Sequence, residues 1–353
     1  VATLWLDEVT DLGAPTARGV AWSRAEWVDR TMPAWERLVA PVAEGVATAI
    51  GDSMRARLAG DESGTLSALA GGSGVNPAAL LGQVQGVVDR MSGAIFTTQL
   101  GEALGTLAED VVTGTEVCLP LVPEDEVAIL PVAVAQVSTD LELDLDGVWL
   151  YLAVRETARH RLFRAVPWLG DALERAVHDH AAGTNVDTES VEAALSSADP
   201  SDPESLRDAL GGSLFAPAAT PEQAAALARL ETWLALIEGW VDVVTSRATT
   251  GHLPHAAALG EAVRRRRATD GPAQKAFATL VGLELRPRRL RDAANLWAAL
   301  EERHGAEGRD RVWSHPDQAP SADDLDDVLG FVERAGASAT DDEIDAFLRD
   351  ALG

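Results

Sequence analysis

The stretch "YLAVRETARHRLF", residues 151–163, decides the fold, because it combines a helical pattern with charges that do not belong in it. At 100° per residue its apolar side chains share one face of a helix, and Arg155 and Arg159 lie one turn apart inside that face. Burying an unpaired charge is costly. The stretch therefore predicts a buried helix over residues 145–164 whose arginines meet acidic side chains from another element.

A second helix is predicted to begin after Thr220 and to end near Ser246. Thr220 and Gln223 have the spacing of a capping box, and Pro221 occupies the first helical position. Three carboxylates border its apolar stripe: Glu231, Glu238 and Asp242. These carboxylates therefore point along the border of a buried surface.

The remaining elements predict a mostly α-helical protein of the α+β class with a small β hairpin or sheet. Apolar residues at helical spacing over residues 20–58 favour a long helix or a pair kinked at Pro33 and Pro41. Two short β-branched runs, residues 116–122 and 127–132, flank a turn-like segment and predict the hairpin. Cys118 in the first run is expected to be a small buried residue rather than a nucleophile.

Two regions are expected along the chain, or one continuous domain. Residues 1–135 would form an N-terminal helical region that contains the hairpin at about 116–132. Residues 136–353 would form a second helical region, with an excursion rich in Ser, Asp, Pro and Gly at about 196–220.

Composition limits the classes of function. A formal net charge of -27 repels phosphate backbones, so we expect no nucleic-acid partner. No long uncharged apolar run is present, so we expect no membrane partner, and the single cysteine favours the reducing cytoplasm. A protein or peptide is the expected partner; the sequence does not specify which.

Three segments, residues 150–169, 227–244 and 277–317, resemble the zincin-like hydrolases, a family of unknown function often labelled zinc-dependent metalloproteases. One branch of that family is described as associated with coenzyme F420 biosynthesis. The resemblance covers roughly residues 90–335 and implies a zincin-like helical core.

In metal-binding relatives the first of these helices carries His-Glu-x-x-His, which places two histidines on one face to share zinc, with the glutamate as general base. The resemblance assigns Arg155 and Arg159 to the two histidine positions, Glu156 to the general base, and Glu238 to the downstream glutamate ligand. Arginine keeps its proton in proteins and cannot ligate zinc. The resemblance thus implies a degenerate site that holds no metal or other cofactor, in a protein that binds or regulates. In this site the two guanidinium charges would replace the metal's charge opposite Glu238, Asp242 or Glu231.

Two alternatives stay open. An active metal-dependent hydrolase or peptidase could keep Glu156 as base and use a rearranged ligand set, in which His160, one turn later, joins Glu238 or Asp242. In the other alternative the protein is an interaction scaffold, with contacts made by its acidic surface or by arginine-rich segments such as residues 264–267.

Overall fold

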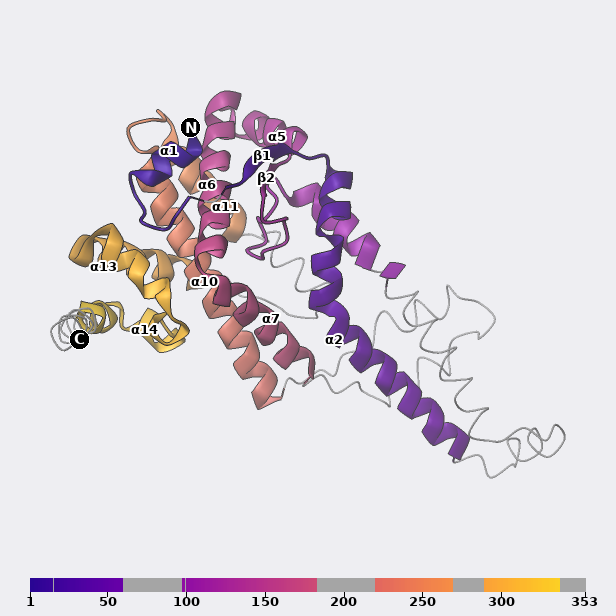
Figure 1. Cartoon of the computed structure of the whole chain (residues 1–353). Helices are drawn as coiled ribbons and strands as arrows, with labels where there is room; N and C mark the ends of the chain where they lie inside the picture. Colours follow the sequence, from indigo (N-terminus) through magenta and orange to yellow (C-terminus); the bar gives the residue numbers. More distant parts are fainter. Residues whose placement is uncertain (15, 60–96, 99, 183–219, 269–288, 337–353) are drawn as a thin grey trace.

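The computed structural model describes residues 1–14, 16–59, 97–98, 100–182, 220–268 and 289–336 (Figure 1). Two helices, α6 (Leu145–Ala165) and α10 (Pro221–Thr249), run through the middle of the molecule. A small sheet and α5 (Pro131–Leu141) lie on one side of them, and α13 (Leu290–Arg311) lies on the other. The predicted class, mostly helical with a small sheet, is confirmed.

The two central helices begin where the sequence predicts. The Asp144 side chain caps α6 by accepting a hydrogen bond from the Gly147 amide at 2.9 Å. In α10 the Thr220 hydroxyl accepts from the Gln223 amide, and the Gln223 side chain accepts from the Thr220 amide. These caps satisfy amide groups that have no partner within the helix, and so they fix each starting residue.

A long helix, α2 (Arg24–Ala59), contains both Pro33 and Pro41 and extends away from the rest of the molecule (Figure 1). Its first half is anchored by Trp27 and Trp35, which are fully buried. The Trp27 indole also donates to the Gly114 carbonyl at 3.1 Å. This bond ties α2 to the loop that precedes the sheet.

The predicted hairpin is wrong, although a small sheet is present. Strand β2 (Glu126–Ile129) pairs in parallel with β1 (Arg18–Ala21), more than a hundred residues earlier. Residues 116–119 form turns, and Cys118 there has a φ of 62°. Parallel pairing requires a long crossover and leaves no local turn signal, whereas the hairpin was inferred from a local signal.

Further elements surround this centre: α1 (Ala2–Asp7), α7 (Pro167–Ala182), α11 (Ala256–Ala268), α14 (Ala322–Asp326) and the 3₁₀ turns Val312–Ser314 and Pro316–Gln318. Residues 100–110 and 328–336 are also helical. In the described ranges no helix is long and apolar enough to cross a membrane. The excursion expected at about 196–220 lies outside the described residues except at its last position. The division at residue 135 stays a prediction.

Candidate functional site: a buried arginine–glutamate cluster beside a cleft

Arg155 and Arg159 of α6 both bond to one carboxylate, Glu238 of α10. One Glu238 oxygen, Oε2, accepts from Arg155 Nη2; the other, Oε1, accepts from Arg159 Nη2 at 2.9 Å and Nε at 3.2 Å. The side chain of Arg155 is only 5% exposed, that of Arg159 1% and that of Glu238 4%. Since so little water reaches them, each charge depends on its protein partners.

Glu156 is the second carboxylate of this cluster, and both of its oxygens accept hydrogen bonds. Oε2 accepts from Arg159 Nη1 at 2.7 Å, while Oε1 accepts from the Thr115 amide at 2.7 Å and hydroxyl at 2.9 Å. A Cβ atom on Gly114 would lie 3.2 Å from that same Oε1 and 2.5 Å from a Val122 methyl. Glycine at position 114 therefore lets the loop reach Glu156.

The charges of the cluster reinforce one another. Burial by itself lowers the pKa of Arg155 and of Arg159, but the negative charge of Glu238 and further charged neighbours outweigh burial, so both pKa values lie above the usual value. Both guanidinium groups are therefore charged at any physiological pH. Their two positive charges balance the two carboxylates, Glu156 and Glu238.

The other predicted site residues lie at the edge of the cluster or away from it. Asp242 Oδ1 is 3.5 Å from Arg155 Nη1, and its Oδ2 accepts from Arg264 at 3.2 Å. Glu231 lies seven residues before Glu238 on α10, about 10 Å along the axis. His160 is buried in the wall of a different cavity, so the structure does not join it to Glu238.

Sequence reasoning missed two members of the cluster because both come from the turn region of residues 113–119. Thr115 binds Glu156, as described, and Cys118 places its Sγ 2.8 Å from Glu238 Oε1. Cys118 is buried, as expected, but it lies in a turn rather than a strand. A glycine between two threonines, "TGT" at 113–115, is the sequence signal that could have marked this close approach.

These residues do not fit a zinc ion. Two of the three positions that would hold it are arginines, which offer only donors, and the one carboxylate accepts from both of them. Within the described part of the chain, no group of three or more His, Cys, Asp or Glu side chains is arranged to hold a metal.

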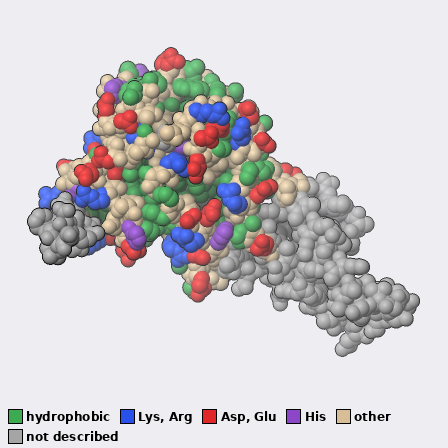
Figure 2. Space-filling view, in the orientation of Figure 1, with side chains coloured by type: hydrophobic (Ala, Val, Ile, Leu, Met, Phe, Trp, Pro, Cys, Tyr) green, Lys and Arg blue, Asp and Glu red, His purple; other side chains and the backbone are tan. Residues whose placement is uncertain are grey.

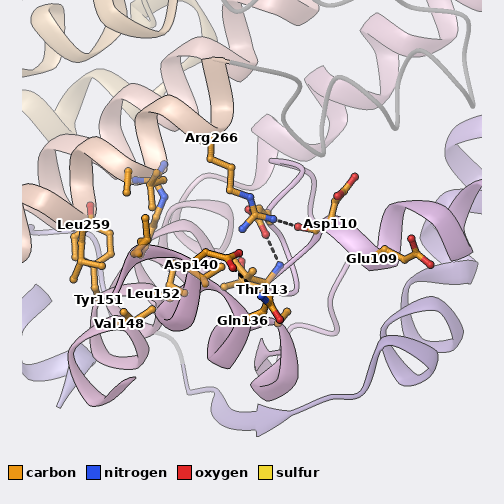
Figure 3. A pocket seen from close by; sticks show the side chains of 18 of the residues that line it. Glu109, Asp110, Thr113, Gln136, Asp140, Val148, Tyr151, Leu152, Leu259 and Arg266 are labelled. Atoms are coloured by element: carbon orange, nitrogen blue, oxygen red, sulfur yellow. Dashed lines mark hydrogen bonds and ion pairs between the residues drawn. The ribbon is translucent and has the colours of Figure 1, made fainter. Parts of the chain in front are cut away.

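A cleft of about 340 Å³ opens directly beside the cluster, with Arg155 and Arg159 in its wall. Its walls come from α5, α6, α11, the segment around residues 109–116 and Arg24, the first residue of α2. Figure 3 shows apolar side chains at one end, Val148, Tyr151, Leu152 and Leu259, and the carboxylates Glu109 and Asp110 at the other. The cleft can thus receive an apolar group at one end, while the rest of its lining offers both carboxylates and the arginines Arg24, Arg155, Arg159 and Arg266.

The arginine-rich segment expected on the surface is largely neutralised by neighbouring acids. Arg264 pairs with Asp242 at 3.2 Å and with Glu261 at 3.3 Å, and Arg265 pairs with Glu261 at 2.9 Å. Arg266 turns into the cleft, where it bonds to the Asp110 carbonyl (Figure 3). Acidic and basic side chains are likewise interspersed over the face in Figure 2.

Comparison with known proteins gives a family and a fold. The sequence profile of the zincin-like metallopeptidases matches residues 1–332, a wider span than the motifs predicted. The chain also resembles the crystal structure of a "putative hydrolase with a novel fold" from Chloroflexus aurantiacus, with a TM-score of 0.60 and 18% identity over 94% of this chain and 86% of the other. No curated protein matches the sequence.

Proposed function

Since this chain belongs to the zincin-like metallopeptidase family and yet has arginines at both histidine positions, we propose that it is a zinc-independent member that binds a protein or peptide segment in its cleft. One observation carries the proposal: Arg155 and Arg159 both bond to the buried Glu238. The two guanidinium charges supply the positive charge that zinc supplies in metal-binding relatives. The protein scaffold around the cleft therefore keeps its charge balance without the metal.

The active-hydrolase alternative has less support. A general base needs a free lone pair directed at the water it activates. Three of the roughly four lone-pair sites of the Glu156 carboxylate are occupied, two by Thr115 and one by Arg159, which leaves at most one for a water, and His160 lies in the wall of another cavity. The scaffold alternative is weakened because Arg264 and Arg265 are paired with acids.

The cleft matches a peptide better than a polyanion. A cavity of 340 Å³ lies in the usual range for small-ligand sites and can accept one or two side chains of a segment. Its apolar end, at Leu152 and Leu259, suits an aliphatic or aromatic side chain, and the mixture of carboxylates and arginines in the rest of the lining suits the polar groups of a peptide. The net charge of -27 also attracts positively charged partners.

Zinc content tests the first half of the proposal. Mass spectrometry of the purified protein, after dialysis and again after zinc loading, is expected to find far less than one zinc per chain. The double variant Arg155→His/Arg159→His recreates the metal-binding pattern and frees Glu238, so it should retain about one zinc per chain. The single variant Arg155→His is the matched control and should bind zinc much more weakly. Stoichiometric zinc in the unmodified protein that is lost in Glu238→Ala and His160→Ala would overturn the proposal.

Peptide binding tests the second half. Phage-displayed random heptapeptides would be selected on the protein, and the affinities of enriched sequences measured by fluorescence polarisation. Ala262→Trp blocks the cleft from α11, whereas Ala257→Trp puts the same bulk on an exposed position outside it. We expect binding at least about tenfold weaker to Ala262→Trp and unchanged to Ala257→Trp. Equal binding to both variants, or no enrichment, would refute the cleft as the binding site.

A further inference from the structure

A second cavity, about 390 Å³, lies between α2, α6 and the loop of residues 120–124. It contains Thr115, whose hydroxyl binds Glu156, so it reaches the cluster from a different side than the cleft. Its volume is typical of small-molecule sites. Nothing in the family assignment accounts for it.

Arginines dominate the charge of this cavity. Arg30 and Arg37 enter it from α2, and Arg164 enters from α6, whereas Glu124 is the one carboxylate in its lining as described. In a chain with 56 acidic and 29 basic residues, three arginines to one acid is a local reversal of charge. Such a reversal favours anions at this point of the surface.

The arginines are not committed to strong partners. Arg37 donates to the Pro33 carbonyl on its own helix, and within the described residues it has no carboxylate partner. Arg30 is 3.9 Å from Glu126, which already bonds to Arg18 at 2.6 Å. Arg164 pairs with Glu124, but that carboxylate is 80% exposed, so an incoming anion can displace it at little cost.

His160 adds a buried donor to the same wall. The residue is 5% exposed, and its ring lies against the backbone of Pro123 and Glu124. Neither ring nitrogen makes a well-aligned hydrogen bond with the described residues. An acceptor in the cavity would compete for this ring with the backbone of Pro123 and Glu124.

Apolar side chains complete the cavity. Phe163, Leu121 and Val122 line it together with proline and alanine side chains. We propose that this cavity binds a small amphipathic anion, a phosphate monoester or carboxylate with a short apolar group. The guanidinium groups of Arg30, Arg37 and Arg164 hold the headgroup, and Phe163 and Leu121 contact the apolar group. Guanidinium groups suit either headgroup because they can donate two parallel hydrogen bonds to it.

Isothermal titration calorimetry with phenyl phosphate tests the proposal, with benzoate, inorganic phosphate and phenol as comparison ligands at constant ionic strength. Phenyl phosphate or benzoate is expected to bind saturably. Inorganic phosphate, which lacks the apolar group, and phenol, which lacks the charge, should each bind at least about tenfold more weakly. Phenol that binds as tightly as phenyl phosphate would refute a role for the arginines.

Matched variants locate the site. Arg37 is exposed, so Arg37→Ala should preserve the fold. It should weaken the binding of phenyl phosphate or benzoate at least about tenfold. Arg229→Ala removes the same charge from an exposed pair with Asp179 and should leave binding unchanged. Arg266→Ala removes an arginine from the first cleft and should also have no effect. The proposal fails if neither amphipathic anion binds, if Arg229→Ala weakens binding as much as Arg37→Ala, or if only Arg266→Ala weakens it.

Discussion

Replacing Glu238 with glutamine is expected to destabilise the protein severely, because it removes the charge that two buried arginines share. Removing one partner of a buried ion pair costs about 3–5 kcal/mol, since the other charge stays buried and unpaired. Here Arg155 loses its closest carboxylate, and Arg159 keeps only Glu156. We therefore expect the free energy of unfolding to fall by about 4 kcal/mol or more, a large part of the 5–15 kcal/mol of a typical domain.

Urea unfolding followed by tryptophan fluorescence measures this loss. The buried Trp240 of α10 and Trp297, which donates a hydrogen bond to the Leu236 carbonyl of α10, are suitable reporters. The matched control is Glu222→Gln, an exposed carboxylate in the first turn of the same helix, which should cost no more than about 1 kcal/mol. The double variant Arg155→Met/Glu238→Gln removes one charge of each sign and leaves Arg159 with Glu156. It should be more stable than Glu238→Gln alone, because it has no surplus buried charge. A loss below about 1 kcal/mol in Glu238→Gln would refute the argument that these charges are buried and mutually dependent.

Two further predictions concern packing and pH. Gly239→Ala should lower the free energy of unfolding by about 1–3 kcal/mol, because the added Cβ would lie 2.7–2.8 Å from the backbone of α13 at Ala293 and its neighbour. Gly101→Ala, on a helix with open space around it, should leave that free energy unchanged or raise it slightly. Equal urea midpoints for the two variants would contradict this prediction. Burial lowers the pKa of His160 below its usual value of about 6.5 despite the opposing charge of Glu156, so the unfolded state takes up this proton first as the pH falls. The stability that His160 contributes is thus complete above about pH 6.5 and is lost below it. Between about pH 7.5 and 5.5, the free energy of unfolding should therefore drop less in His160→Gln than in the unmodified protein. An identical drop would show that His160 is not the group responsible.

The main helices and the unusual character of the site could be predicted from the sequence because their signals are local. Apolar periodicity gave α6 and α10, and Thr220 with Gln223 gave the start of α10. Arg155 and Arg159 inside an apolar face required partners for their charges, whatever the fold. These properties depend on residues within a few turns of one another, and so neighbours in the chain determine them.

Tertiary structure decided which distant groups meet. It paired residues 126–129 with β1 instead of a nearby run, and chose Glu238 over Glu231 as the shared partner of the arginines. It also brought Thr115 to Glu156 and turned His160 toward another cavity. Each of these choices depends on the packing of the whole chain, because contacts between residues far apart in sequence are fixed only when the core assembles, and no local pattern carries that information.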